Sequence, residues 1–289
     1  MNESIKKQKR LVFDPDKLRS SRARSLSIEM PNIIYDKTEY DIESRLEDIR
    51  KEFKSILIIT KNIKKNYLHK IISKKSEVII IGPNYNANKS NYIVVDDNNL
   101  PFHKPKFDLI ISDLILHTSN NLKLSLENLR NLLLPDGLLI ATMFGQKTLF
   151  DLKQCLISAE DNISGKTYPR INPFIDIKTA GDILYSSGFK LCVVDSYDVR
   201  VKYSQASELI QLIRSMGENN YINLNKPSLK RKVWIKAINM MEEKNDYENY
   251  GISEKFEILT LTGWKFHENQ QKPMKPGSAK HKLADFLEN

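Results

Sequence analysis

The chain has 289 residues, of which 40% are hydrophobic and 28% charged, enough to bury one large core or a core with a smaller unit beside it. This composition excludes a disordered chain. Apolar runs such as "SILIIT" and "EVIIIG" are far shorter than the roughly 20 residues that a membrane helix needs. The opening "MNESIKKQKR" has no apolar segment for secretion, so we expect an intracellular location: the cytoplasm of a bacterium or the mitochondrial matrix of a eukaryote.

Charge is distributed unevenly along the chain. The formal net charge is +9, and residues 1–26 hold eight Lys or Arg against three acids, a net +5. We therefore predict a basic N-terminal segment over residues 1–37. Such a segment suits an acidic protein surface or a phosphate backbone, although a solvated basic helix face explains the same pattern.

The cysteines and histidines do not indicate a metal or redox site. Cys155 and Cys192 lie in apolar, periodic segments and are predicted to be core thiols rather than a pair. The five histidines lack the close spacing that zinc requires, so we predict no metal.

The first half of the chain alternates between helices and strands. Apolar residues at helical spacing from Ile42 to Phe53 predict a helix that begins near Thr38. A second helix, with Ile63 and Ile72 on its apolar face, is expected after the first strand. The predicted strands are 55–60, 77–82, 91–97, 107–115 and 138–145. Because these runs are continuously apolar, they predict a parallel sheet covered on both faces, and hence an α/β fold.

The second half departs from this alternation. Helices are predicted at 122–133, 148–160 and 176–187, and strands at 189–197 and 256–264. Between these last two strands, a short strand at 199–203 and helices within 207–217 and 228–244 predict an inserted helical cap over about 198–250. We therefore predict one domain over 38–264 that includes the cap, followed by a polar tail over 265–289.

Ligands of an open parallel sheet bind beyond the carboxyl ends of its strands. After the first strand a tight nucleotide-binding turn needs glycine, yet Thr60, Lys61 and Asn62 stand there. Asparagine tolerates the left-handed conformation, whereas a lysine in it costs about 1–2 kcal/mol. After the second strand, Gly82 and Pro83 replace the acid that would hold a ribose. The sequence therefore predicts a degenerate nucleotide site.

The third and fourth strand ends keep polar candidates. Asp96 and Asp97 could receive the amino group of an adenine, although a turn or helix-capping role explains them equally well. The fourth strand leads to Leu116 and His117. His117 could line a ligand site or act as a general base, or it could simply be hydrogen-bonded.

The run "FDLIISDLILHTSNNLKLSLENLRNLLLPDGLLIATMFGQKTLFDLK" resembles class I S-adenosylmethionine-dependent methyltransferases. More specific are the opening "LVFDPDKLRSSRARSL", the middle stretch beginning "RINPFIDIKTAGDILYSSGF" and the closing "FEILTLTGWKFHENQQKPMKPGSAKHKLADFL". These are similar to the alphaproteobacterial and mitochondrial family of NADH dehydrogenase (complex I) assembly factor 5, a relative of the malonyl-carrier methyltransferases of biotin synthesis.

The resemblance implies a Rossmann-like seven-stranded sheet, an S-adenosylmethionine site and a role in maturing a complex I subunit. For the mitochondrial relatives it implies hydroxylation of an arginine rather than methylation. His117 would be the catalytic candidate. The cofactor-binding positions would be Thr60, Asn62, Gly82, Asp96, Asp97 and Leu116. Since the glycine-rich loop and the ribose acid are absent, we expect S-adenosylmethionine to bind poorly or not at all.

Three functions are compatible with the sequence. One is an S-adenosylmethionine-dependent enzyme, methyltransferase or hydroxylase, that modifies a protein side chain. Another is a catalytically inactive pseudoenzyme of the same fold that binds a complex I subunit as an assembly scaffold. The third, a nucleic-acid methyltransferase, is suggested by charge alone and lacks the acidic-proline-aromatic tetrad, since "SDLI" follows the fourth strand. The expected partner is therefore a protein subunit, without nucleic acid, metal or an integral membrane segment.

Overall fold

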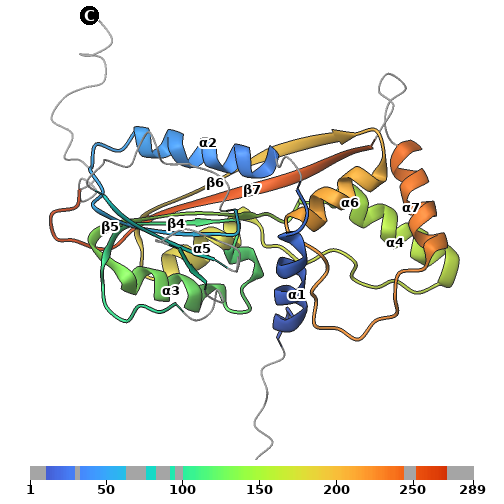
Figure 1. Ribbon diagram of the computed structural model, residues 1–289, viewed down its shortest axis with the longest axis horizontal. Helices are drawn as coiled ribbons and strands as arrows, with labels where there is room; N and C mark the ends of the chain where they lie inside the picture. The colour runs from blue at the N-terminus through green and yellow to red at the C-terminus, as the bar shows by residue number, and fades with distance from the viewer. Residues whose placement is uncertain are drawn as a thin grey trace, which may run out of the picture.

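The computed structural model describes residues 11–29, 33–62, 76–82, 92–94, 100–243 and 252–271 (Figure 1). In chain order its elements are α1 (Pro15–Ser25), α2 (Ile33–Glu47), β1 (Ser55–Thr60), β2 (Glu77–Gly82), β3 (Tyr92–Val94), β4 (Phe107–Asp113), the 3-10 turn η1 (Leu116–Thr118), α3 (Leu122–Leu132), β5 (Leu133–Phe144), α4 (Phe150–Ser164), α5 (Ile177–Ser186), β6 (Lys190–Tyr203), α6 (Ala206–Ser215), α7 (Arg231–Glu243) and β7 (Ile252–Trp264).

The described strands form one sheet in the order β3-β2-β1-β4-β5-β7-β6. Strands β1 to β5 are parallel; Ile58 of β1, for example, lies opposite Ile80 of β2 and Ile111 of β4. Strand β7 runs antiparallel to both β5 and β6. The predicted α/β fold is confirmed. Because strand order reverses between β1 and β4, the carboxyl ends of these two strands mark the expected ligand position.

Helices cover both faces of the sheet, with α2 on one face and α3 and α5 on the other (Figure 1). In β1, Ile56 and Ile58 pack in the cluster under α2, whereas Leu57 and Ile59 pack in the cluster with α3 and α5. Two buried faces explain why the strand is continuously apolar.

Helices α4, α6 and α7 form a second group around the far ends of β6 and β7 (Figure 1). The prediction of a separate strand at 199–203 was wrong, because these residues are the second half of β6. Val199 pairs with Phe256, and Val201 with Glu254, both of β7. The polar residues that interrupt the apolar pattern before Val199 are tolerated because β6 is the last strand in the described sheet order.

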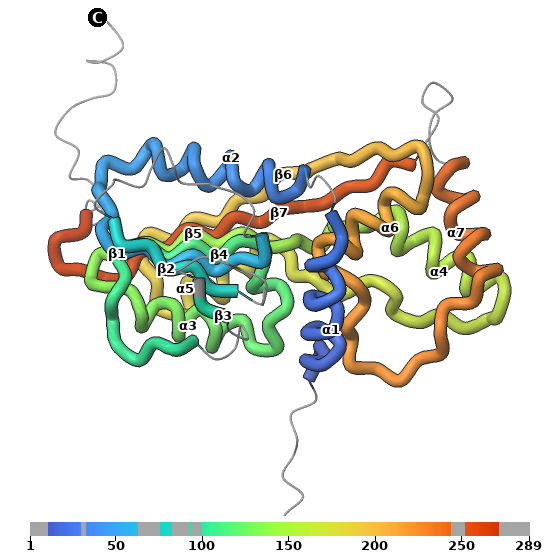
Figure 2. The backbone as a smooth tube through the Cα atoms, viewed as in Figure 1, coloured from blue at the N-terminus to red at the C-terminus, as the bar shows by residue number. Residues whose placement is uncertain are grey.

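Helix α1 lies between the sheet and the group of α4, α6 and α7 (Figure 2). Asp14 caps it, accepting hydrogen bonds from the backbone nitrogens of Asp16 (3.0 Å) and Lys17 (3.2 Å). Its inner face buries Leu18 and Arg22. Helix α1 therefore packs on one face through Leu18 and Arg22, whereas its other basic side chains, Lys17, Arg19 and Arg24, are exposed.

The predicted start of the helix before β1 was also wrong. Helix α2 begins at Ile33, and Thr38 lies inside it, where its hydroxyl donates to the carbonyl of Tyr35 (3.1 Å). Phe53 lies beyond the end of α2 but joins the same core cluster. The helix expected over Ile63–Ile72 lies outside the described residues.

Candidate functional site

The carboxyl end of β1 is closed by protein. Thr60 is 2% exposed and Lys61 9% exposed. The Nζ of Lys61 donates to the carbonyl oxygen of Met216 (3.1 Å) and forms an ion pair with the carboxylate of Glu218. The segment that follows α6 therefore lies against the end of β1.

Glu218 is the centre of a buried ionic cluster that consists of Lys61, His117, Glu218 and Tyr221. Its Oε2 lies 3.1 Å from Nε2 of His117 and accepts a hydrogen bond from the hydroxyl of Tyr221 (2.8 Å). All four residues are buried. The cluster joins the end of β1, the turn η1 after β4 and the loop after α6, which are the elements around the expected ligand position.

The charges within this cluster can be assigned from its geometry. Burial by itself would raise the pKa of Glu218, but the charge of Lys61 and the contacts with His117 and Lys61 hold that pKa far below its ordinary value. Burial lowers the pKa of His117, only partly opposed by Glu218. The cluster therefore contains one ion pair, Lys61 with Glu218, and a neutral His117 whose Nε2–H donates to the carboxylate.

Helix α1 closes the cluster from the side. Arg22 is 3% exposed, and its Nη2 donates to the hydroxyl of Thr118 (3.0 Å). The hydroxyl of Ser21 donates to the carbonyl of Gly217 (2.8 Å). Gly217 has φ +69°, a left-handed conformation that turns the chain from α6 into Glu218. A glycine at this turn is thus what brings the acid back to β1.

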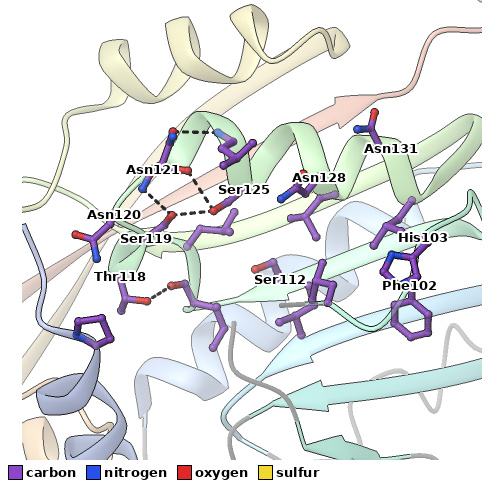
Figure 3. Close-up of a pocket in the computed structure, with 18 of the residues that line it drawn as sticks. Phe102, His103, Ser112, Thr118, Ser119, Asn120, Asn121, Ser125, Asn128 and Asn131 are labelled. Carbon is purple, nitrogen blue, oxygen red and sulfur yellow. Dashed lines mark hydrogen bonds between the residues drawn. The ribbon is translucent and has the colours of Figure 1, made fainter. Parts of the chain in front are cut away.

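An amide-lined cavity of about 560 Å³ opens beside the cluster, between β4, the loop at 100–103, η1 and α3 (Figure 3). None of its described lining residues is Lys, Arg, Asp or Glu. The side chain of Ser112 is completely buried at this cavity, and its hydroxyl has no hydrogen-bond partner among the described residues. The polar lining residues of the cavity are His103, Ser112, Thr118, Ser119, Asn120, Asn121, Ser125, Asn128 and Asn131. Such a lining suits an uncharged ligand with hydrogen-bonding groups.

The described residues that the sequence singled out lie at or just after the ends of the neighbouring strands β1, β2 and β4, but in different surroundings. The hydroxyl of Thr60 accepts a hydrogen bond from the backbone nitrogen of Asn62 (3.1 Å), and Gly82 ends β2 opposite Val94. Leu116 lines the amide-lined cavity, and His117 belongs to the buried ionic cluster. The two acids predicted to contact adenine, Asp96 and Asp97, lie outside the described residues.

Sequence reasoning missed three residues of this region. Glu218 and Tyr221 follow a helix in the predicted cap, and no local pattern pairs them with Lys61, which is 157 positions from Glu218. Ser112 lies within the apolar run of β4, where no pattern distinguishes it as a site residue. The one available signal was the "GEN" that follows the apolar face of α6, because glycine there allows a sharp reversal.

No group of three His, Cys, Asp or Glu residues among the described ones could hold a metal ion. Within the same residues, no helix has the length and apolar character to cross a membrane. Cys155 is buried and Cys192 half-buried, and within the described part of the chain neither forms a disulfide.

Comparisons with known proteins agree with this topology. Residues 73–141 match the family model of a methyltransferase domain. The YcgJ protein of Bacillus subtilis aligns with a TM-score of 0.52 at 10% identity, covering 79% of this chain and 99% of that one. The chain has a class I methyltransferase fold.

Several proteins are also similar to this chain in sequence. "Arginine-hydroxylase NDUFAF5, mitochondrial" of the mouse is 35% identical over 187 residues, which are 65% of this chain and 54% of that protein. The zebrafish protein of the same name is 34% identical over 67% of this chain and 60% of its own length. The malonyl-[acyl-carrier protein] O-methyltransferase of Nitrosospira multiformis is 27% identical over 61% of this chain and 55% of its own length.

These matches confirm the resemblance to the assembly factor 5 family. They span little more than half the length of the curated relatives. The family implies S-adenosylmethionine, and the described residues at the end of β1 do not fit it there. Thr60 and Lys61 are buried against protein, and the space beyond Lys61 holds Met216 and Glu218.

Proposed function

We propose that this chain acts in the assembly of complex I by binding a protein subunit, without transferring a group from S-adenosylmethionine. Similarity to the mitochondrial arginine-hydroxylases supports the link to complex I, through the assembly factor 5 family to which the sequence is similar. The buried ionic cluster at the end of β1 supports the second part of the proposal, that no group is transferred from S-adenosylmethionine.

The observation that carries the proposal is the ion pair between Lys61 and Glu218. A ligand that entered beyond β1 would have to separate these two buried charges. Leaving one partner of a buried pair without the other costs about 3–5 kcal/mol, which weakens binding by roughly a hundredfold or more. A fold that has this pair in its ligand position is suited to a role in which that position stays closed.

A second candidate is an S-adenosylmethionine-dependent enzyme that modifies a protein side chain. The amide-lined cavity favours it, because Leu116 and the unpaired hydroxyl of Ser112 both lie there and an uncharged group such as an adenine suits its lining. In this reading the cofactor would contact Thr60, Asn62, Gly82, Asp96, Asp97 and Leu116. His117 would be the catalytic candidate.

The partner in both cases is a protein, a complex I subunit or a protein substrate. We propose that the basic segment at 1–37 and the polar tail at 265–289 flank the methyltransferase-like domain at 38–264 and contribute to this contact. In a bacterium the proposed location is the cytoplasm, and in a eukaryote the mitochondrial matrix.

Affinity purification of the full chain from its own cells tests the proposal. We expect complex I subunits to be recovered with the wild type, without added S-adenosylmethionine, and equally with Asp96→Ala. Deleting residues 1–26 is unsuitable because it would remove Leu18 and Arg22 from the core. Charge variants at the exposed positions Arg19 and Arg24, both to Gln, should instead reduce recovery. Absence of complex I subunits from the wild-type sample, or recovery only with added S-adenosylmethionine, would contradict the proposal.

A further inference from the structure

A second cavity lies among α4, α6 and α7, and it shares no described lining residue with the amide-lined cavity. Its volume is about 270 Å³, and α4, α6, α7 and the start of β7 contribute to its walls. We call it the aromatic cavity because its lining includes the aromatic side chains of Phe144, Phe174, Trp234 and Phe256. A lining of aromatic side chains favours a ligand with a large apolar part.

Three of the four charged residues that line the aromatic cavity are cationic. Its charged lining residues are Arg170, Arg214, Lys226 and Glu218. Two of these are already compensated: Arg170 binds the carboxylate of Glu160 (2.5 Å), and Glu218 is paired with Lys61. Two positive charges remain for the cavity.

Arg214 and Lys226 have no acidic partner among the described residues. Lys226 donates to two neutral oxygens, the carbonyl of Pro169 (2.7 Å) and the side chain of Asn220 (2.5 Å). Arg214 is exposed at the end of α6. Partial burial and the positive charges of Arg170 and Lys17 lower the pKa of Lys226 to about 8, with Glu160 opposing. The rim therefore has an excess of positive charge.

We propose that the aromatic cavity binds an apolar carboxylate, with the hydrocarbon body among the aromatic side chains and the carboxylate at the rim beside Arg214 and Lys226. An anion compensates the two cations, which a neutral ligand leaves unpaired. At about 30 Å³ for a water-sized group, the cavity holds roughly nine heavy atoms, close to the size of octanoate. The inference goes beyond the proposed function, because it involves neither a complex I subunit nor S-adenosylmethionine.

Tryptophan fluorescence tests this site directly. The chain has two tryptophans, and only Trp234 lines the aromatic cavity, whereas Trp264 packs in the cluster under α2. In the full chain with Trp264→Phe, we expect octanoate to change the emission of Trp234 saturably. Octanamide, which has the same body without the charge, should bind roughly tenfold more weakly, the loss expected when a charged hydrogen-bonding group is removed.

Charge variants identify the rim. Arg214→Gln and Lys226→Gln should each weaken octanoate binding by roughly three- to tenfold and leave octanamide unchanged. Lys230→Gln removes the same charge from an exposed position outside the lining and should have no effect. Circular dichroism checks that the variants are folded. Because Arg214 is exposed, its substitution should leave the core intact. Equal affinity for octanoate and octanamide, insensitivity to both rim variants, or no saturable response below the micellar concentration of octanoate would overturn the proposal.

Discussion

The carboxylate of Glu218 is held by three side chains: Lys61 and His117 from distant parts of the chain, and Tyr221 three residues further along. A buried acid without such partners would be expected to take up a proton. Here the positive charge of Lys61 keeps it ionised and thereby ties the loop after α6 to β1. The stability of this contact depends on both charges being present.

Removing one charge should therefore destabilise the protein more than removing both. We expect Glu218→Gln to lower the free energy of unfolding by about 3–5 kcal/mol, because Lys61 then stays buried without a counter-charge. The double variant Lys61→Met with Glu218→Gln should recover much of that loss. Lys106→Met, which breaks the exposed pair with Glu77, should cost no more than about 1 kcal/mol. Urea unfolding measures all three, and a Glu218→Gln chain as stable as the wild type would contradict the assignment of a buried ion pair.

Acid should destabilise the protein through His117. The unfolded histidine has its ordinary pKa of 6.5, and burial lowers the pKa in the folded protein. The unfolded chain therefore takes up the proton first as the pH falls below 6.5. The stability from neutral His117 is full above that pH and is lost as the pH falls towards the lower folded pKa. Glu218, with its lowered pKa, adds a loss of the same sign below 4.5.

The free energy of unfolding, measured between about pH 7 and pH 5, distinguishes this contribution. Wild type should lose stability over this interval, and His117→Gln should lose less. His103→Gln, at an exposed position, should follow the wild type. Parallel curves for His117→Gln and the wild type would show that His117 is not the group that titrates.

At this scale the sequence singled out Lys61 and His117 separately but did not predict that they meet in one cluster. Thr60 and Lys61 in place of glycines were enough to predict a degenerate turn after the first strand. The partner of Lys61 could not be predicted, because Glu218 is 157 positions away and a glutamate in a loop is ordinarily exposed.

At the scale of elements, strands were the easiest to predict. Strand β1 was predicted with its observed bounds because both of its faces are buried and its apolar run is uninterrupted. The later half of β6 was misread because its outward residues are polar, which resembles a break in the strand. The start of α2 was missed because a threonine inside a helix has the same sequence pattern as a capping threonine.

The junction between α6 and α1 depends on one glycine. Gly217 has φ +69°, and a side chain there would lie 3.2 Å from the hydroxyl of Ser25 and 3.3 Å from the Cα of Arg22. Gly165, at the end of α4, has a similar φ of +61° but no atom within 4 Å of such a side chain. Comparing the two glycines therefore distinguishes the cost of backbone strain from the cost of steric crowding.

Replacing each glycine by alanine tests this junction. Gly165→Ala should cost about 1–2 kcal/mol of unfolding free energy through backbone strain alone. Gly217→Ala should cost roughly 1 kcal/mol more, since α1 must also move away from α6. Thermal or urea unfolding gives both values, and equal losses would mean that α1 does not pack closely at this turn.

On the scale of the whole molecule, several elements meet at the buried ionic cluster. Lys61 follows β1, His117 lies in η1, Glu218 lies in the loop after α6, and α1 covers them. The periodicity of the sequence predicted the strands of the sheet and the helices α6 and α7, and the resemblance to a methyltransferase family predicted the fold. The sequence did not predict that α1 and the loop after α6 close over the strand ends, because that contact depends on long-range packing of polar residues, which leaves no periodic pattern.

Calorimetric titration of the folded chain with S-adenosylmethionine tests the central claim, that the space beyond β1 is taken by Met216 and Glu218. We expect no heat beyond that of dilution up to about 1 mM ligand, which corresponds to binding weaker than roughly −4 kcal/mol. Saturable binding at one ligand per chain with a dissociation constant in the micromolar range would contradict it.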